Sequence, residues 1–414
     1  MFTDHLAIAL SILLRVFSLW FLLTALLFWK RPKPYPLRAP KTRFACLIPA
    51  RNEEAVVGAL VESLRAQDYP DALYDIYVIP NNCTDGTEDA ARAAGAKIFR
   101  CFDPVKNKGD ALHETIAWLL PRRMENRPTA PEYDAFCVFD ADNVADSHFL
   151  ARMNDAFLAG AKVAKGRLLV KNPRDSWVAG CYSLYFTLGD LFFSRSRANL
   201  GLSAKLVGTG FAVNREVFER LGGWNTSSIA EDAEFSAQCA ALGERVWWVS
   251  DAVSYDEAPV SFRVSLTQRR RWCSGIMAAA VIMLPRLLRA APNADRSRAV
   301  DSVFFLCSPF AQALSVLPPL LLAFGAAAEK TLAGWTLLTA ASLALGFCGA
   351  LLGACALAFL AHRRCCALAV LLFPLFMASF LPLQLLALLR PTTQWHTIRH
   401  ERNVAFAQLS CQNE

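Results

Sequence analysis

Hydrophobic residues are unevenly distributed along the 414-residue chain. The two flanks contain long apolar runs, whereas residues 44–262 alternate short apolar runs with segments of mixed polarity. The long runs are Leu6–Trp29, Ser302–Gly325, Leu332–Ala361 and Cys365–Leu389. Each run is long enough, as a helix, to cross about 30 Å of hydrocarbon. The pattern therefore predicts a soluble domain held between membrane-spanning flanks.

The first long run predicts an uncleaved anchor. It carries one charge, Arg15, is too long for the apolar core of a signal peptide, and lacks a small-residue cleavage site after it. Residues 30–43 then contain six Lys and Arg and no acidic residue, and such basic segments stay on the cytoplasmic side. We therefore expect a multi-pass protein of the inner or plasma membrane with a cytoplasmic domain.

The C-terminal flank poses a topological problem. Three spans after a cytoplasmic domain would place the tail outside the cell, yet Arg390, Arg399 and Arg402 favour the inside. Prolines such as Pro309 and Pro374 are compatible with a segment that enters the membrane without crossing it. The sequence therefore leaves the number of spans open.

A shorter apolar segment, Met277–Arg289, precedes this flank. It is apolar on one side and flanked by Arg, which predicts a helix lying in the membrane interface. A core helix of the soluble domain is the alternative. The expected units are an anchor with its basic segment (1–43), a soluble domain (44–275), an interfacial segment (276–298), membrane helices (299–390) and a tail (391–414).

Within the soluble domain, strand and helix patterns alternate. Short apolar runs predict strands at Phe44–Pro49, Tyr74–Ile79, Lys97–Arg100 and Ala135–Phe139. Amphipathic segments predict helices at Glu53–Gln67, in the stretch ending at Ala94, and at Lys108–Leu120. This alternation predicts an α/β fold with a mostly parallel sheet covered on both faces. Ligands of such folds bind beyond the carboxyl ends of the strands, where polar clusters stand in this chain.

Composition and charge narrow the function further. Hydrophobic residues make up 54% and charged residues 19% of the chain, which excludes a disordered protein or a coiled coil. The net charge is +7, but residues 44–262 hold 22 basic and 30 acidic side chains, a net charge of −8. The basic character thus belongs to membrane-flanking stretches, which predicts contact with lipid headgroups or phosphates and no nucleic-acid partner. The 13 cysteines show no paired spacing, which predicts reduced thiols.

Two acidic motifs are the first candidates for chemistry. Asp140 and Asp142 end an apolar strand and, being two residues apart, share one face of it. Such a pair suits Mg²⁺ or Mn²⁺ shared with substrate phosphates, although a solvated turn explains the motif equally well. Glu231 and Asp232 open a helix, where either they complement the helix dipole or one serves as a general base.

Three further motifs favour phosphate and sugar binding. The run from Gln268 to Trp272 (QRRRW) offers arginines that could grip a diphosphate and a flat ring for a sugar, or could bind lipid headgroups alone. Residues 106–110 (KNKGD) precede a helix start that could receive a phosphate. The tight turn Gly208–Gly210 lets the backbone approach a ligand. No Gly-x-Gly-x-x-Gly follows the first strand and no Walker A motif occurs.

The order of these motifs resembles that of membrane-embedded family 2 glycosyltransferases. In chain order they are IPARNEE (Ile48–Glu54), NNCTDGT (Asn81–Thr87), NKG (Asn107–Gly109), DAD (Asp140–Asp142), GTG (Gly208–Gly210), ED (Glu231–Asp232) and QRRRW (Gln268–Trp272). The resemblance is strongest to the branch of cellulose, chitin, hyaluronan and poly-N-acetylglucosamine synthases. It covers about residues 44–275 and the flanking membrane plan.

The resemblance implies a GT-A fold and an inverting transfer from a UDP-sugar with Mg²⁺ or Mn²⁺. Asp142, supported by Asp140, would match the metal ligand, and Asp232 with Glu231 the catalytic base. The nucleotide sugar would contact Pro49, Arg51, Glu53, Asn81, Lys108, Gly109, Asp140, Ala141, Arg269 and Arg271. The acceptor and diphosphate would contact Gly208, Thr209, Gly210, Gln268 and Trp272. The tail Gln394–His400 faintly resembles a cytoplasmic segment that covers the donor site in such synthases.

Two positions depart from the family pattern. Asn81 stands where an Asp usually contacts the uracil, and Ala230 stands where a Thr usually precedes the Glu-Asp pair. An amide both donates and accepts hydrogen bonds, so it can still pair with the edge of a base. The departure puts the nucleotide preference in question but leaves Asp142, Asp232 and the Arg and Trp motif in place.

Three functions follow from this reading. We expect a synthase that extends a β-linked polysaccharide, which the QRRRW motif favours. Such a synthase would need enough helices, or a homo-oligomer, to form a channel for the polymer. The alternative is a transferase that adds one sugar to a lipid acceptor such as diacylglycerol or a polyprenyl phosphate. A non-catalytic protein that binds a nucleotide sugar is the third, supported only by Asn81 and Ala230.

Overall fold

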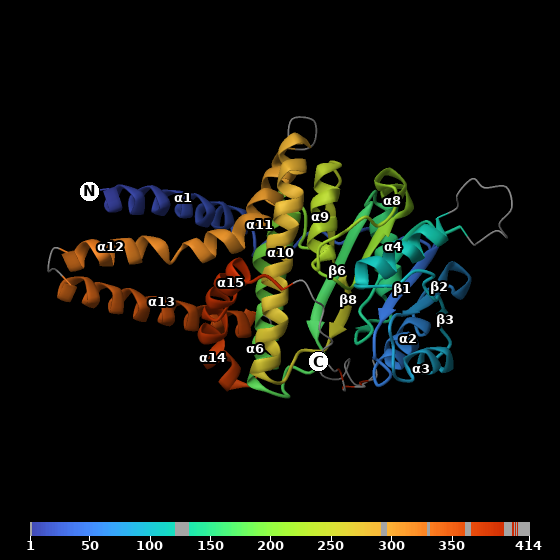
Figure 1. Ribbon diagram of the computed structural model, residues 1–414. Helices are drawn as coiled ribbons and strands as arrows, with labels where there is room; N and C mark the ends of the chain where they lie inside the picture. The colour runs from blue at the N-terminus through green and yellow to red at the C-terminus, as the bar shows by residue number, and fades with distance from the viewer. Residues whose placement is uncertain are drawn as a thin grey trace.

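The strands form one mixed sheet in the computed structural model, which describes residues 2–120, 132–290, 296–328, 332–360 and 366–392 together with His400, Arg402 and Val404. Within these residues eight strands lie in the order β3-β2-β1-β4-β7-β6-β8-β5 (Figure 1). Their bounds are β1 Phe44–Ala50, β2 Tyr74–Pro80, β3 Lys97–Ile98, β4 Ala135–Val138, β5 Val144–Ala145, β6 Val163–Val170, β7 Phe211–Asn214 and β8 Val246–Asp256.

The pairing of the strands confirms the predicted α/β fold with a mostly parallel sheet. Strands β3, β2, β1 and β4 are parallel neighbours, as are β6 and β8. Strand β7 is the exception near the centre, antiparallel to both β4 and β6, and β5 is antiparallel to β8 at the edge. The sequence reading assigned no strand at β7, because its four residues are too few to show a period of two.

Helices cover both faces of the sheet, as the alternating pattern predicts. They are α2 Val57–Arg65, α3 Thr87–Ala93, α4 Lys108–Leu119, α5 Phe149–Leu158, α8 Arg215–Leu221 and α9 Glu231–Ala241, with a short 3₁₀ turn at Asp71–Leu73. The central strand β1 shows why both faces are covered: all seven residues are buried. Phe44, Cys46 and Ile48 pack into the core on the side of α2 and α5, while Ala45 and Leu47 pack on the opposite side.

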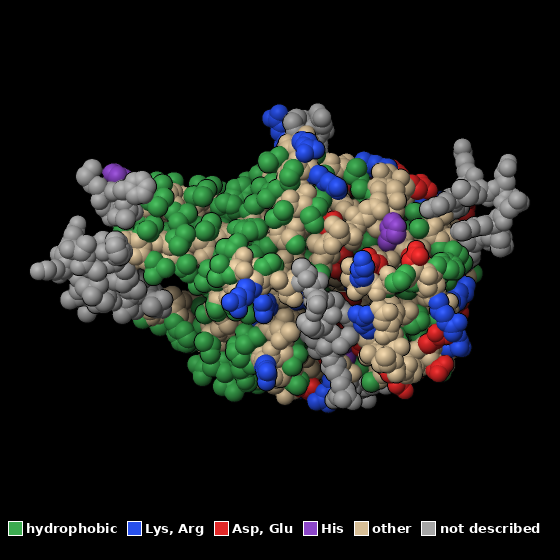
Figure 2. Space-filling model, viewed as in Figure 1, with side chains coloured by type: hydrophobic (Ala, Val, Ile, Leu, Met, Phe, Trp, Pro, Cys, Tyr) green, Lys and Arg blue, Asp and Glu red, His purple; other side chains and the backbone are tan. Residues whose placement is uncertain are grey.

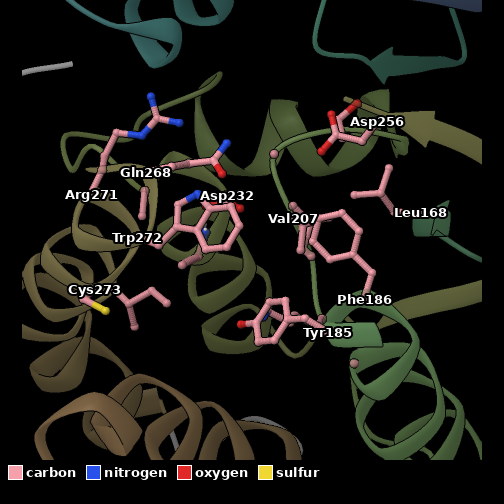
Figure 3. Close-up of a pocket in the computed structure, with 18 of the residues that line it drawn as sticks. Leu168, Tyr185, Phe186, Val207, Asp232, Asp256, Gln268, Arg271, Trp272 and Cys273 are labelled. Carbon is pink, nitrogen blue, oxygen red and sulfur yellow. Dashed lines mark hydrogen bonds between the residues drawn. The ribbon is translucent and has the colours of Figure 1, made fainter. Parts of the chain in front are cut away.

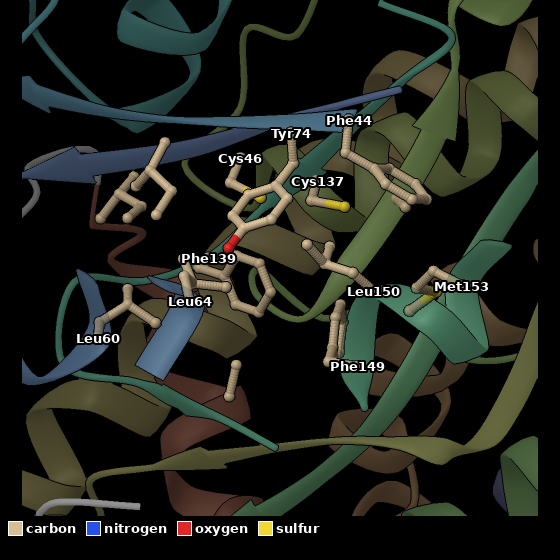
Figure 4. Close-up of a cluster of buried hydrophobic side chains, with 14 of the residues drawn as sticks. Phe44, Cys46, Leu60, Leu64, Tyr74, Cys137, Phe139, Phe149, Leu150 and Met153 are labelled. Carbon is tan, nitrogen blue, oxygen red and sulfur yellow. The ribbon is translucent and has the colours of Figure 1, made fainter. Parts of the chain in front are cut away.

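The first of these cores joins side chains from β1, β2, β4, α2 and α5. Figure 4 shows Phe44 and Cys46 of β1 together with Cys137, Phe139 and the α5 residue Phe149. The buried cysteines in this core are free thiols, as the described cysteines are throughout. Packing of this kind fixes the ends of β1 and β4, and therefore the polar residues that follow them.

The remaining helices, apart from α6, which contacts β6, extend away from the sheet. They are α1 Phe2–Ala25, α6 Trp177–Leu188, α7 Ser196–Leu200, α10 Phe262–Ala290, α11 Arg296–Leu314, α12 Leu317–Ala328, α13 Leu332–Leu360, α14 Ala367–Ala378 and α15 Phe380–Leu389, with a π-helical segment η2 at Gly189–Arg195 that joins α6 to α7. In Figure 1, α1, α12 and α13 form an arm that points away from the sheet.

Four segments of the described chain are long and apolar enough to cross a membrane: His5–Ala25, Phe262–Ala290, Arg296–Leu322 and Ala367–Leu389. Figure 2 shows hydrophobic side chains gathered over the helical arm, whereas most charged side chains lie over the sheet. The first, third and fourth segments match expected runs, while the expected span at Leu332–Ala361, within which Ala344–Phe359 is a shorter apolar helical stretch, stays a prediction.

Helix α10 differs from its expected division. The sequence reading ended the soluble domain at residue 275 and began an interfacial segment at 276, but one helix continues through this point from Phe262 to Ala290. Ala279, Ala280 and Met283 are buried against α9 and α11. The apolar side of Met277–Arg289 therefore packs largely on neighbouring helices, and its place in the membrane interface stays a prediction.

A buried ion pair ties three separate helices together. Arg197 of α7 donates to both carboxylate oxygens of Asp301 in α11, at 2.8 and 3.0 Å. Trp20 of α1 donates to the same carboxylate through Nε1 at 2.9 Å. Arg197 and Asp301 are 1% and 4% exposed, so each charge depends on the other for compensation. The pair therefore fixes α1 and α11 against the segment that follows η2.

We expect Arg197→Met to destabilise the protein by about 3–5 kcal/mol, because it leaves the Asp301 carboxylate buried without its cation. On a protein of this size that corresponds to a fall in Tm on the order of 10 °C. The measurement is thermal unfolding in a fixed detergent. The matched control is Arg92→Met, which removes an exposed pair with Glu88 and should change stability by about 1 kcal/mol or less. Equal changes in Tm for the two variants would contradict a stabilising role for the buried Arg197–Asp301 pair.

Candidate active site

A cavity of about 790 Å³ lies where the carboxyl ends of the strands meet the helices. Figure 3 shows Gln268, Arg271 and Trp272 of α10 on one side of it and the rings of Tyr185 and Phe186 of α6 on another. Fifteen residues predicted from the sequence line this cavity: Pro49, Arg51, Glu53, Asn81, Lys108, Asp140, Ala141, Asp142, Gly208, Thr209, Glu231, Asp232, Gln268, Arg271 and Trp272.

Three predicted residues, Gly109, Gly210 and Arg269, lie outside the lining. Gly109 is buried in the first turn of α4, where a Cβ would meet Thr226 Oγ1 at 2.8 Å. Gly210 has a φ of +62°, and a Cβ there would lie 2.5 Å from Ser254 Oγ. Both glycines therefore permit close packing beside the cavity and do not face it.

Arg269 is the clearest departure from the expected diphosphate contacts. Its side chain is fully buried and donates to Ser265 Oγ, to the Phe376 carbonyl at 2.9 Å and to Ser379 Oγ at 2.8 Å. Its guanidinium also lies 4.0 Å from the centre of the Phe376 ring. Position 269 falls on the face of α10 that packs on the junction of α14 and α15, whereas 268, 271 and 272 face the cavity.

Lys108 sits at the start of α4 and reaches across the cavity. Asn107 caps the helix in a reciprocal capping box with Asp110, which fixes the first turn. Lys108 Nζ donates to Asp140 Oδ1 at 2.6 Å and to the Gly208 carbonyl, and lies 3.6 Å from Glu231 Oε1. Burial opposes its charge, but the Asp140 and Glu231 carboxylates outweigh that and raise the pKa of Lys108. One ammonium thus joins three motifs from distant parts of the chain.

Glu231 and Asp232 form the first turn of α9, which begins after Ala230. Burial, reinforced by the neighbouring Asp232 and Asp140 carboxylates, raises the pKa of Glu231 to about 7. Burial likewise raises the pKa of Asp232, whose Oδ1 accepts the Ala233 N–H at 2.7 Å. A carboxylate whose pKa is raised toward neutrality is suited to accept a proton.

A second acidic group gathers around Asp142, which is 5% exposed. Asn143 donates to Asp142 Oδ1 at 3.3 Å and to Asp256 Oδ1 at 3.0 Å. Burial and the nearby Asp142 and Asp140 carboxylates raise the pKa of Asp256 well above its ordinary value. These side chains offer hard oxygen donors of the kind that Mg²⁺ or Mn²⁺ prefers, but among the described residues no three His, Cys, Asp or Glu side chains are arranged to hold a metal ion.

His400 of the tail enters the same group. Its Nδ1 lies 3.0 Å from Glu53 Oε2, and its Nε2 lies 3.7 Å from Asp142 Oδ2. Burial opposes protonation, yet Asp142 and Glu53 raise the pKa of His400 to about 10. Burial would raise the pKa of Asp142, but His400 and Lys171 lower it overall. The rest of the tail segment likened to a donor-site cover, Gln394–Arg399, lies outside the described residues.

Asn81 lies at the end of β2 and is 9% exposed. Its Nδ2 donates to the carbonyls of Ala50 and Ile79, at 3.1 and 3.4 Å. With the nitrogen engaged in this way, its oxygen is the group that it can offer to an N–H of a base. The substitution of Asp by Asn therefore preserves a hydrogen-bond acceptor at this position and removes its charge.

Helix α10 supplies the polar and aromatic wall of the cavity. Gln268 Oε1 accepts from the Tyr182 hydroxyl at 2.6 Å, and Trp272 stacks on Tyr185 with 18° between the ring planes. These contacts hold Gln268 and Trp272 in place. Beside them, Arg271 interacts electrostatically with Glu231, Asp140 and Asp232. The arrangement can present a flat ring and a cation to a sugar and its phosphates.

Several lining residues were missed in the sequence reading. Among the charged ones are Lys165, Asp190, Lys205, Asp256 and Glu257. Asp256 and Glu257 had a detectable signal, because they end a long alternating strand, β8, that is parallel to β6. Asp190 lies in η2 and Lys205 in a loop before β7, so neither follows an apolar run that would have marked it.

The cavity also extends between the membrane-type helices, by which we mean the helices in the segments long and apolar enough to cross a membrane. Its lining there comes from α1, α11, α14 and α15 and comprises Phe21, Phe305, Ser308, Pro309, Gln312, Met377, Ala378, Phe380, Leu381 and Gln384, with Ser315 just after α11. The polar half with its carboxylates and the apolar half therefore form one continuous space.

Comparisons with known proteins agree on one family. A profile of the family described as "Glycosyltransferase like family 2" matches residues 40–275. A protein of Bacillus subtilis (strain 168) named as a probable glycosyltransferase, YdaM, is 26% identical over 275 residues, covering 64% of this chain and 61% of that protein. A beta-monoglucosyldiacylglycerol synthase of Synechocystis sp. is 27% identical over 258 residues, covering 58% of this chain and 48% of that protein. The chain thus spans about half to three-fifths of the length of these curated relatives.

The solved structures include one with a similar fold over nearly the whole chain. This is the mannosyltransferase PcManGT of Pyrobaculum calidifontis, determined in complex with GDP-Man and Mn²⁺. It aligns with a TM-score of 0.61 at 19% identity, covering 94% of this chain and 98% of the other. The likeness confirms the GT-A fold.

The raised pKa of Glu231 makes a prediction for stability. The fold favours the protonated form of Glu231. This residue therefore stabilises the folded state fully below about pH 4.5, and the stabilisation is lost as pH rises through about 7. Glu231→Gln removes this pH dependence. The Tm of the variant minus the Tm of wild type should therefore increase from pH 4.5 to pH 7.5. For the exposed control Glu216→Gln, whose partner Lys162 lowers the pKa of Glu216, no such rise is expected. A Tm difference for Glu231→Gln that stays constant with pH would refute the prediction.

Proposed function

The chain belongs to glycosyltransferase like family 2, and on that premise we propose that it transfers one sugar from a nucleotide sugar to a hydroxyl group of a membrane lipid. The observation that carries the proposal is the continuity of the cavity. It runs from Asp140 and Asp232 to Phe305 and Gln384 on helices of the type that crosses membranes. A lipid that enters between these helices would bring its head to the carboxylates while its chains stay in apolar surroundings.

The relatives support a lipid acceptor. Three of the curated relatives are named as beta-monoglucosyldiacylglycerol synthases, each 26–27% identical to this chain. The name describes those proteins, which attach a sugar to a lipid. Together with the apolar half of the cavity, it favours the lipid acceptor over the polysaccharide acceptor.

The donor would occupy the polar half of the cavity. Asn81 would accept a hydrogen bond from the base, while Lys108 and Arg271 would face the diphosphate. Asp140 and Asp142 would hold a divalent cation, which neutralises charge on the diphosphate when bound. A UDP-sugar follows from the family resemblance, and the neutral Asn81 leaves a guanine nucleotide as the alternative to test.

The reaction then needs one base and one electrostatic clamp. Asp232 would take the proton of the acceptor hydroxyl as its oxygen forms a bond to the anomeric carbon. The bond from that carbon to the diphosphate oxygen breaks on the opposite side, so the anomeric configuration inverts. Lys108 and Arg271 stabilise the charge that develops on the leaving diphosphate. Trp272 would stack against the sugar ring beside the attacking hydroxyl.

A polysaccharide synthase is the second candidate function, because Gln268, Arg271 and Trp272 stand together in the cavity wall as they would for a sugar-chain acceptor. An aromatic face beside an acidic base serves a sugar chain as well as a single sugar. Such an enzyme would have to pass its polymer between the described helices or through a homo-oligomer. In either case we place the catalytic domain on the cytoplasmic side of the plasma or inner membrane, in keeping with the basic residues 30–43.

Product size separates the two functions. Purified protein in nanodiscs is given radiolabelled UDP- and GDP-sugars, Mg²⁺ or Mn²⁺ and membrane lipids. The proposal expects label in the organic extract as a lipid that carries one sugar. Label that elutes as a high-mass, water-soluble polymer supports the synthase and contradicts lipid transfer.

Asp232→Asn should lower the transfer rate by about 10²- to 10⁴-fold, because an amide cannot take the proton of the acceptor. The fold should survive, since the amide has the shape of the carboxylate. Nucleoside diphosphate release and thermal unfolding measure the two effects. The control Asp251→Asn changes an exposed residue of β8 and should leave the rate as it is. A rate for Asp232→Asn within twofold of wild type would reassign the base.

A further inference from the structure

Three arginines meet where the segment after α1 docks on the sheet domain. Arg31 follows α1, Arg167 lies in β6 and Arg195 ends η2. Burial lowers the pKa of Arg195, and repulsion from Arg167 and Arg31 lowers it further. Among the described residues, Asp190 is the carboxylate that opposes this repulsion, and it accepts a hydrogen bond from Arg167 Nε at 3.3 Å. Three cations thus stand around one acidic side chain.

Contacts with η2 and α7 fix the segment that carries Arg31. Asn199 of α7 donates through Nδ2 to the carbonyl of Lys30 at 2.7 Å. The ring centres of Phe28 and the η2 residue Phe192 lie 4.6 Å apart. The chain immediately before Arg31 is therefore held against the elements that carry and follow the other two arginines of this group.

Two buried donors in this region have no acceptor. Arg195 Nε and Trp248 Nε1 are both enclosed, and neither atom has a hydrogen-bond partner among the described residues. The Arg195 guanidinium lies over the Trp248 ring, 5.8 Å from its centre, so the two donors belong to one place. Buried donors without acceptors are costly. The lack of acceptors and the excess of positive charge both point to an anionic ligand.

The place of this group in the chain indicates where the anion comes from. Arg167 and Arg195 belong to residues 44–262, whose net charge is −8, so the group is a local exception in an acidic domain. Arg31 stands shortly after Ala25, the end of a segment that is long and apolar enough to cross a membrane. A site at the end of such a segment stands at the level of the lipid headgroups. The anion nearest to hand there is the phosphate of a membrane lipid.

We propose that Arg31, Arg167 and Arg195 form a binding site for the phosphate group of an anionic membrane lipid. A guanidinium suits phosphate because it offers paired N–H donors in a planar fork. Three arginines and Asp190 carry a net charge of +2, which matches a phosphate monoester with its charge of about −1.5 to −2 at pH 7. None of the three arginines lines the cavity. The lipid bound here is therefore a resident ligand and not the acceptor of the proposed transfer.

The test titrates phosphatidic acid into the full-length protein in a neutral detergent and follows Tm. This lipid carries a phosphate monoester and no alcohol group, so its binding is independent of the proposed transfer. Wild type should show a saturable rise in Tm, whereas phosphatidylcholine, whose net charge is zero, should give none. Arg195→Met and Arg167→Met should each weaken the apparent affinity by about tenfold, the loss expected for one charge-assisted hydrogen bond.

Controls separate recognition from damage to the fold. Arg289→Met removes an exposed arginine in the last turn of α10 and should leave the affinity within about twofold of wild type, because an exposed charge contributes little. Without lipid, the Tm of Arg195→Met should not fall below that of wild type, since the variant removes a cation repelled by Arg167 and Arg31. A merely structural role of Arg195 would lower this Tm and leave the lipid affinity unchanged.

Each remaining outcome decides against the inference. No saturable rise in wild type, or equal rises with phosphatidic acid and phosphatidylcholine, shows that the site does not recognise the anionic lipid. Equal weakening in Arg195→Met and Arg289→Met shows only a general attraction between a basic surface and anionic lipid. A rise produced by inorganic phosphate at the same concentrations, and lost in the same variants, assigns the site to free phosphate and overturns the lipid.

Discussion

Buried negative charge at one edge of the sheet is the constraint on which the rest of the site depends. Asp140, Asp142, Glu231, Asp232 and Asp256 all line one cavity, so several acidic side chains are held close together there. Cationic side chains from distant segments of the chain compensate part of this negative charge. Lys108 joins Asp140 to Glu231, and His400 lies between Glu53 and Asp142. In the proposed function, the remaining carboxylates would bind a divalent cation, which would in turn neutralise the diphosphate of the donor.

The helices of the membrane type complete this site and are not merely its support. Helix α10 carries Gln268, Arg271 and Trp272 at the cavity and then continues to Ala290 along α9, α11 and α15. Arg269, on another face of the same turn, bonds to the junction of α14 and α15. The groups that would meet the donor are therefore rigidly coupled to the helices that would receive the acceptor.

Much of this could be predicted from the sequence because it depends on local patterns. Short apolar runs followed by Asn81 and Asp140 identified two strand ends, and the continuous apolar run at Phe44–Pro49 predicted the buried strand β1. The place of Arg269 could not be predicted, because which face of α10 packs on α14 is decided by tertiary contacts. The place of Gly210 likewise depends on its packing against Ser254, which is distant in the sequence. Gln312 and Gln384, which share a hydrogen bond in the cavity wall, are 72 residues apart, and nothing local marks them as partners.

The central claim is that donor and acceptor meet in one cavity that opens between the membrane-type helices. The most direct test is a structure of the protein in lipid nanodiscs with a nucleoside diphosphate, Mn²⁺ and diacylglycerol. The account predicts the nucleotide between Asn81 and Lys108, and a lipid between α11 and α15 with its hydroxyl within hydrogen-bond reach of Asp232. A sugar chain in that space, or a lipid bound only on the outer surface of the helices, would contradict it.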